Sequence, residues 1–152
     1  MKKHFNSFQE LRACVGQDVA VSDWCTVTQS QINQFADATN DHQWIHIDQE
    51  KAAAGPFGAP IAHGFLTLSL LPRFFESAFS IAQTRMGLNY GLNKVRFTAP
   101  VPVNSRLRSH LHLMACEEIE PHGIQMTWKV SVEREGSDKP VCVAESLVRH
   151  YA

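Results

Sequence analysis

The chain has 152 residues, of which 44% are hydrophobic, and its 14 basic and 15 acidic side chains leave a formal net charge of −1. A chain of this length buries enough surface for a stable core, so we expect one domain spanning residues 1–152 that needs neither disulfides nor a structural metal. The balanced charge, without a run of five like charges, argues against nucleic acid or an anionic membrane as a partner.

The cysteines are scattered along the chain and form no Cys-x-x-Cys pair: Cys14, Cys25, Cys116 and Cys142. This spacing favours buried free thiols over a zinc site or a redox pair. No secretory signal pattern follows the N-terminus, and no run of about 18 apolar residues occurs anywhere. We therefore expect a soluble protein of a reducing compartment, most simply the cytoplasm.

The N-terminal half of the chain has mostly helical signals. Residues 7–14 suggest a short helix, and residues 19–27 alternate enough for a first strand. Thr28 and Gln31 have the spacing of a capping box, which predicts a helix that ends near Asn40. That helix would carry Ile32, Phe35 and Ala36 on one face.

A long polar connection with a short helical stretch at residues 48–54 runs from Asn40 to His63. Such a connection inside a compact domain is more often functional than idle. Residues 65–81 are then apolar in every helical direction, which predicts a buried helix. Pro72 lies inside this segment, so we expect a kink or a break beside it.

The C-terminal half shows the alternation of strands at residues 91–97, 107–113, 124–133 and 141–150. Short loops between consecutive strands favour an antiparallel meander with one face on the core. The predicted fold class is therefore α+β, with a buried helix laid against a curved antiparallel sheet.

The densest group of reactive side chains lies in the stretch NDHQWIHID, residues 40–48. Asp41 and His46 stand five positions apart in irregular backbone, where a carboxylate and an imidazole can face one cavity and deprotonate a shared water. Gly64 lies at the start of the buried helix, where its amide would be an unpaired donor for a substrate carbonyl.

Each of these residues also has a structural interpretation. Asp41 is suited to a turn that closes the preceding helix, and His46 to a histidine satisfied within the core. His42, His46 and Asp48 have ligand chemistry for a metal, but their spacing requires a helix where the sequence predicts a loop. We expect no metal, and we favour a structural role for His63 at the entry to the buried helix.

Two stretches, ADATNDHQWIHIDQEKA and GAPIAHGFLTLSLLP, resemble the signature of the MaoC-like dehydratases, the R-specific enoyl-CoA hydratase family. The later stretch NYGLNKVRFTAPVPVNSRLR is similar to the nodulation protein N-like branch of that superfamily. The matches together cover residues 28 to 108. The resemblance implies a hotdog fold, in which an antiparallel sheet wraps a long helix, and which is usually dimeric.

The resemblance also implies a reaction, the reversible addition of water to trans-2-enoyl-CoA to give (R)-3-hydroxyacyl-CoA. His46 would take a proton from water, while Asp41 orients that water and assists protonation at C2. The Gly64 amide would polarise the thioester carbonyl. Coenzyme A is part of the substrate here, so no separate cofactor is expected.

Further contacts to the thioester substrate are expected from His63, Phe65, Tyr90, Asn93, Lys94 and Arg96. Arg106 and Arg108 are additional candidates for the coenzyme phosphates. The chain departs from well-known single-domain members of the family at Pro72, where a serine supports the aspartate. Four residues remain candidates for that orienting role: Thr67, Ser69, Tyr90 and Asn93.

Two other functions remain compatible with these residues. One is an acyl-CoA thioesterase of the same fold, and the other is a non-catalytic module that binds an acyl ligand. The thioester carrier is either coenzyme A or an acyl carrier protein. A helix and a sheet in so short a chain leave exposed strand edges, which predict a homodimer with the active site near the subunit interface.

Overall fold

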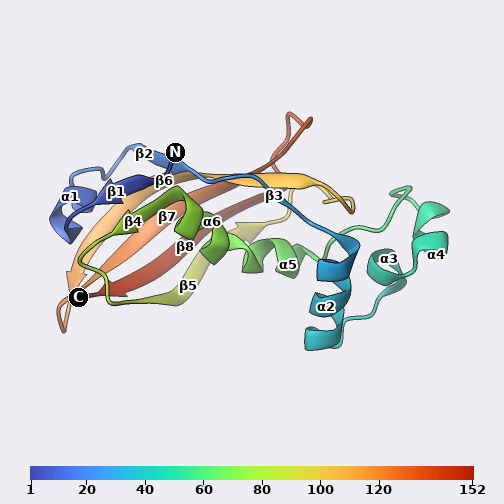
Figure 1. The fold of residues 1–152 in the computed structure, drawn as a ribbon, viewed down its shortest axis with the longest axis horizontal. Helices are drawn as coiled ribbons and strands as arrows, with labels where there is room; N and C mark the ends of the chain where they lie inside the picture. The colour runs from blue at the N-terminus through green and yellow to red at the C-terminus, as the bar shows by residue number, and fades with distance from the viewer.

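The computed structural model describes all of residues 1–152 as a curved antiparallel sheet with a helix across one face (Figure 1). The strands follow one another in the order β2, β6, β7, β8 and β5, and β3 pairs with β6 beside β2. Their bounds are β2 Asp18–Val21, β3 Cys25–Thr26, β5 Met86–Arg96, β6 Arg106–Ile119, β7 Gly123–Arg134 and β8 Cys142–Tyr151. The predicted α+β arrangement is confirmed, although the first strand is divided into β2 and β3.

The strand order corrects one expectation from the sequence. Strands β6, β7 and β8 form the predicted meander, but β5 pairs with β8 and not with β6, its neighbour along the chain. The segment between β5 and β6 leaves the sheet edge instead of turning back, and it bonds to the residues before the central helix. The Ala62 amide donates to the Val101 carbonyl oxygen, and the Val103 amide donates to the Pro60 carbonyl oxygen. Strand β5 therefore lies at the opposite edge from β2 (Figure 1).

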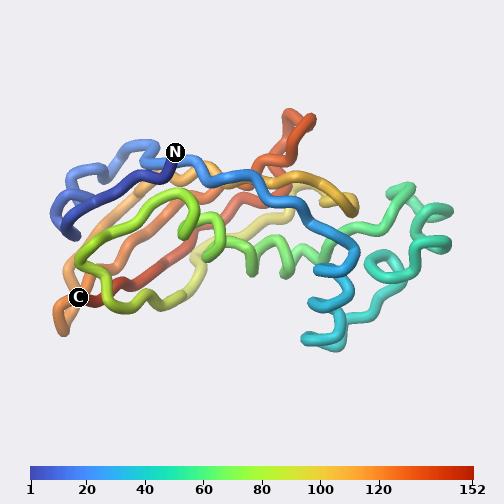
Figure 2. The backbone as a smooth tube through the Cα atoms, viewed as in Figure 1, coloured from blue at the N-terminus to red at the C-terminus, as the bar shows by residue number.

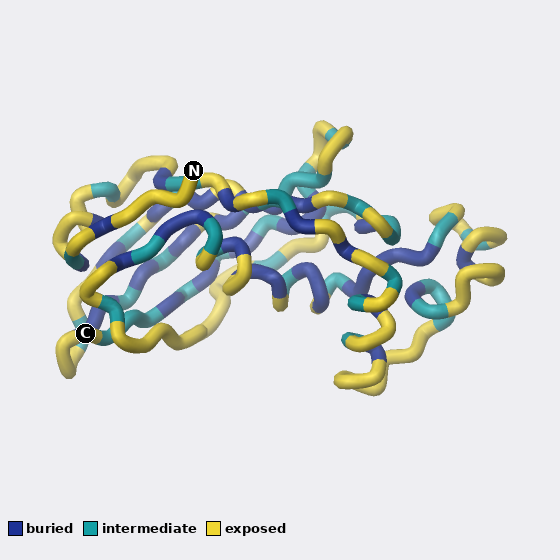
Figure 3. Tube along the Cα trace, in the orientation of Figure 1, coloured by how far each residue is buried: buried dark blue, intermediate teal, exposed yellow.

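The core lies between the helix and one face of the sheet. Alternate side chains of β7 are fully buried, among them Met126, Trp128 and Val130, while the residues between them are more exposed. Phe75 packs edge-on against Trp128, with ring centroids 5.6 Å apart. Figure 3 shows the middle strands buried and the β5 edge exposed.

The central helix is broken as Pro72 predicts. Helix α5 spans Gly64–Ser69, and α6 spans Leu71–Ala78 with Pro72 in its first turn. Two parts of the expectation are wrong. The last apolar residues, Phe79–Ile81, form strand β4, which pairs in parallel with β1 (Lys3–Phe5). The Phe65 side chain, which the expectation placed in the core, is 68% exposed within the single chain.

The remaining helices follow the local signals in the sequence. Helix α1 spans Phe8–Arg12, and α2 spans Gln29–Thr39 between a Thr28 N-cap and a left-handed Asn40. The polar connection holds α3 (Trp44–Ile47), which the sequence did not predict, and α4 (Gln49–Ala53). In the trace of Figure 2, α2, α3 and α4 gather beyond one end of the sheet, and the chain then returns into α5, while α1 lies near the opposite end. None of the helices is long and apolar enough to span a membrane.

The four cysteines are free, as predicted, but only three of them are buried. Cys25, Cys116 and Cys142 are buried, while Cys14 is half-buried. Burial raises the pKa of Cys142 to about 11, so this thiol is not a nucleophile near neutral pH.

Candidate active site

His46 is held by the Ile61 backbone at its ring and by the Gln29 side chain at its own backbone. Its Nδ1 lies 2.6 Å from the Ile61 carbonyl oxygen, so this nitrogen carries the proton and donates it. Gln29 Nε2, from α2, donates to the His46 carbonyl oxygen at 2.8 Å. In this tautomer Nε2 carries no proton, and its lone pair can accept a proton from water.

The environment keeps His46 neutral. The side chain is buried, and burial lowers its pKa more than the Ile61 carbonyl and the Asp41 carboxylate raise it. The neighbouring His63 lowers it further. A neutral imidazole at physiological pH is the form that a general base requires.

Asp41 and His63 complete a compact cluster around His46. The three side chains each present a ligand-type atom, and these atoms lie within 4.8 Å of one another. The His63 ring stacks on His46 at a centroid distance of 3.8 Å, and its Nε2 donates to the Asp41 carbonyl oxygen at 3.0 Å. His63 thus fixes the backbone at Asp41, while the Asp41 carboxylate stays exposed to solvent.

The cluster is poorly arranged for a metal. The two imidazole rings stack with an interplanar angle of 24°, so their lone pairs lie in nearly parallel planes and do not converge on one point. The other two members of the metal set considered from the sequence make contacts of their own. His42 pairs with Asp37 at 2.9 Å, and Asp48 caps α4 through the Lys51 amide.

The Gly64 amide lies at the first position of α5 and has no hydrogen-bond partner in the chain. A Cβ built on Gly64 would lie 2.7 Å from a carbon of the Phe97 ring. Glycine is therefore required for the close packing of Phe97 over this end of the helix. The absent side chain also leaves the amide open to a carbonyl oxygen.

His46, Gly64 and Thr67 share one cavity of about 440 Å³, which we call the His46 cavity. Its remaining wall is mostly apolar and includes Phe57, Phe97 and Val101. Thr67 is 2% exposed, and its Oγ1 is buried without a hydrogen-bond partner. A base, a backbone donor and an unpaired hydroxyl in an apolar cavity suit an uncharged, polarisable carbonyl substrate.

The structure separates the other predicted contact residues from this cavity. Phe65 lies outside it and meets Phe97 edge-on at 5.9 Å. Tyr90 and Asn93 lie on the exposed strand β5, where Tyr90 stacks on the Arg149 guanidinium at 3.5 Å. Two others, Lys94 and Arg96, line a different hollow near the end of that strand.

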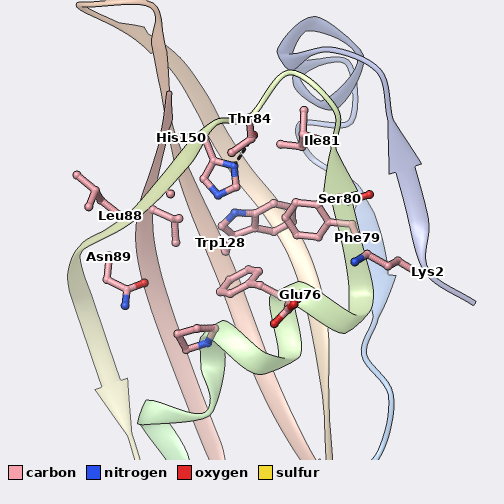
Figure 4. Close-up of a pocket in the computed structure, with 14 residues that line it drawn as sticks. Lys2, Glu76, Phe79, Ser80, Ile81, Thr84, Leu88, Asn89, Trp128 and His150 are labelled. Carbon is pink, nitrogen blue, oxygen red and sulfur yellow. Dashed lines mark hydrogen bonds between the residues drawn. The ribbon is translucent and has the colours of Figure 1, made fainter. Parts of the chain in front are cut away.

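A second cavity lies at the other end of the central helix and contains none of these residues (Figure 4). It has a volume of about 440 Å³ and lies among α6, β4, β5 and β8. Phe79 and Trp128 form its floor, and His150 faces it with Nδ1 bonded to Thr84 Oγ1 at 3.0 Å. Burial lowers the pKa of His150, so this ring is neutral near pH 7.

Residues 10–135 match the family described as MaoC like domain. The chain belongs to the MaoC-like dehydratase family. A Mycobacterium tuberculosis protein named 3-hydroxyacyl-thioester dehydratase Z is 54% identical over 148 residues, which cover 97% of this chain and 98% of that protein. Nodulation protein N of Rhizobium leguminosarum bv. viciae is 44% identical, over 93% of this chain and 89% of its own length.

The fold of this MaoC-like chain is shared with solved structures. The unliganded R-hydratase PhaJ1 of Pseudomonas aeruginosa superposes with a TM-score of 0.72 and 23% identity, over 95% of this chain and 85% of that one. This likeness concerns the fold, and it confirms the hotdog arrangement that the sequence stretches imply.

Three residues of the site were missed or left undecided by sequence reasoning. Gln29 lies 17 positions before His46 and holds its backbone, and Phe97 covers Gly64 from the end of another element. Thr67 was one of four candidates, and burial now singles it out. Of these three residues only Thr67 could be suspected from its position in the sequence, because it lies one helical turn after Gly64.

Proposed function

We propose that the chain is an R-specific enoyl-CoA hydratase that adds water reversibly to trans-2-enoyl-CoA. Membership of the MaoC-like family makes it a hydro-lyase, and the name of its mycobacterial relative supports a 3-hydroxyacyl thioester as product or substrate. The observation that carries the proposal is His46. Its Nδ1 is fixed as a donor, its neutral ring lies in the cluster with Asp41, and it lines one cavity with Gly64.

The proposed step begins with a water held between Asp41 and His46. His46 Nε2 takes one proton as the water oxygen bonds to C3, and the C2–C3 π electrons shift toward the carbonyl. The thioester oxygen gains enolate character, which the Gly64 amide stabilises by donating a hydrogen bond. His46 then gives this proton to C2 with the assistance of Asp41, so that one water has been added across the double bond and His46 is neutral again. Dehydration follows the same path in reverse.

We assign the orienting role of the family's helix serine to Thr67. Thr67 lines the His46 cavity and its hydroxyl is buried without a partner, whereas Ser69 Oγ donates to the Phe65 carbonyl at 2.7 Å within its own helix. Tyr90 and Asn93 lie outside the cavity. A buried hydroxyl without a partner gains a hydrogen bond when a water or carbonyl oxygen enters, which supports the assignment.

The enzyme is proposed to act as a homodimer joined through β5. This edge strand is exposed along almost its whole length in the single chain, and Leu88, Tyr90 and Leu92 are 43% to 57% exposed. Pairing with a second β5 would cover the unpaired backbone groups of the edge and these apolar side chains. The four free thiols suit a reducing compartment, and we place the dimer in the cytoplasm.

The reaction is tested by following the loss of enoyl-thioester absorbance with crotonyl-CoA. We expect turnover in the wild-type protein and its loss in Asp41→Asn and His46→Gln. His112→Gln is a matched control, because His112 pairs with Asp18 on the sheet, away from the His46 cavity. Full activity in both site variants would overturn the proposal, and release of free thiol without hydration would favour a thioesterase.

A further inference from the structure

A hollow of about 490 Å³ lies on the face of the sheet opposite the central helix, and we call it the basic hollow. Lys94 and Arg96 enter it from β5, and Lys129 enters it from β7. Lys129 alternates with the buried Trp128 that contacts α6, so it points away from the helix. Glu145 of β8 is paired in register with both lysines and supplies the one carboxylate of the hollow.

The cations of the basic hollow are not neutralised by ion pairs. Lys94, Arg96 and Lys129 have no carboxylate oxygen within 4.0 Å. Three positive charges against the single Glu145 leave this small surface strongly positive, on a chain whose overall charge is −1. An anionic ligand is therefore drawn to this place by a local field and not by the charge of the whole molecule.

The other two basic candidates differ in this respect. Arg106 donates twice to the Glu135 carboxylate, at 2.8 and 3.0 Å. Arg108 donates to Glu133 at 2.7 Å and lies over the Trp24 ring at 4.3 Å. Their donors are already used, so they are poor partners for a phosphate.

The basic hollow also offers an apolar surface and a path to the His46 cavity. Met114 is 41% exposed and lines the hollow, where its flexible thioether can lie against a flat ring. Thr98 lines both the hollow and the His46 cavity. Since β5 ends at Arg96, a flexible chain can pass from one face to the other around the end of the strand.

We propose that the basic hollow binds the phosphorylated adenosine end of coenzyme A, with its phosphates on Lys94, Arg96 and Lys129 and its adenine on Met114. The inference rests on the proposed function, which places the thioester in the His46 cavity. The site is concave, which fits a nucleotide and not the convex surface of a carrier protein. Coenzyme A is therefore the preferred carrier, and Glu145 opposes its binding through like charge.

The test compares crotonyl-CoA with crotonyl-pantetheine, which has the same thioester and lacks the adenosine and its phosphates. For Lys94→Ala, Arg96→Ala and Lys129→Ala we expect KM for crotonyl-CoA to rise by about tenfold, the effect of losing one charge-assisted hydrogen bond. KM for crotonyl-pantetheine and kcat for both substrates should stay unchanged. Glu145→Gln should lower KM for crotonyl-CoA alone, an effect that a merely structural role would not produce.

Arg106→Gln is the matched control, because it removes a positive charge outside the hollow and should not change the ratio of the two KM values. A direct readout is the titration of wild-type protein with adenosine 3′,5′-bisphosphate, whose binding should be lost in Lys94→Ala. The inference is overturned if the hollow variants affect both substrates equally, or if acyl carrier protein thioesters are preferred. Failure of the wild-type protein to hydrate either substrate would instead count against the proposed function.

Discussion

Replacing Gly64 by alanine keeps the backbone amide but adds a methyl group at the opening of the His46 cavity. The new Cβ would lie 2.7, 2.9 and 3.0 Å from three atoms of the Phe97 ring. Carbon atoms in ordinary contact are about 3.5 to 4.0 Å apart, so the ring must move by roughly 1 Å. Phe97 is 43% exposed and can rotate toward solvent, so the backbone of α5 should keep its position.

Two opposing effects determine the stability of Gly64→Ala. Overpacking costs about 1 to 3 kcal/mol, and replacing a helical glycine by alanine gains about 1 kcal/mol. Because the ring is free to move, we expect the lower end of the cost. The net change in the free energy of unfolding should be about 1 kcal/mol or less, which lowers Tm by at most about 4 °C for a chain of this length.

The effect on activity should be much larger. The Cβ occupies the approach to the Gly64 amide, so we expect kcat/KM for crotonyl-CoA to fall by about 100-fold or more, as when one oxyanion donor is lost. Adding Phe97→Ala should restore Tm but not the rate. Ser69→Ala, on the same helix and outside the cavity, is the control. Wild-type kcat/KM in Gly64→Ala, or recovery of the rate in the double variant, would refute this reasoning.

Three further predictions concern single groups. The base is neutral His46, and burial lowers its pKa below 6.5. Activity should therefore fall only as the pH drops below 6.5. A midpoint above 6.5 in the pH dependence of kcat/KM would contradict the assignment. Thr67→Val should lower kcat about tenfold, the equivalent of one hydrogen bond, without changing Tm, while Thr67→Ser should stay near wild type; equal loss in both would show a packing role. The Trp128 indole N–H is buried without a partner. Trp128→Phe should therefore lower the free energy of unfolding, measured in urea, by only about 1 to 2 kcal/mol, less than is usual for a core aromatic. A loss above about 3 kcal/mol would reveal a hydrogen bond from this N–H.

Features encoded by neighbouring residues were predictable from the sequence. Thr28 accepts the Gln31 amide at 3.2 Å, and α2 ends at the left-handed Asn40, as their side-chain chemistry predicts. Pro72 marks the break between α5 and α6 for an equally local reason. The spacing of Asp41 and His46 identified two members of the cluster because a tight loop brings them together.

Features that depend on distant contacts were not predictable. The apolar segment Phe79–Ile81 continues a helical pattern, and only its pairing with β1 makes it a strand. The place of β5 beside β8 is decided by contacts across the whole C-terminal half. The packing of Phe97 over Gly64 and the bond from Gln29 to His46 likewise join residues far apart in sequence, for which one chain offers no signal.

The position of α2, α3 and α4 beyond the end of the sheet has a consequence for heating. Helix α3 carries His46, and the loop between α2 and α3 carries Asp41. The three helices pack mainly on one another, while the long strands form the largest cooperative unit. A small unit of this kind opens at a lower free energy than the sheet. Thermal inactivation should therefore precede the loss of the β-sheet circular dichroism signal, and backbone amides of α2 to α4 should exchange with deuterium before those of β6 and β7. Catalysis would then fail by local melting while most of the fold is still intact.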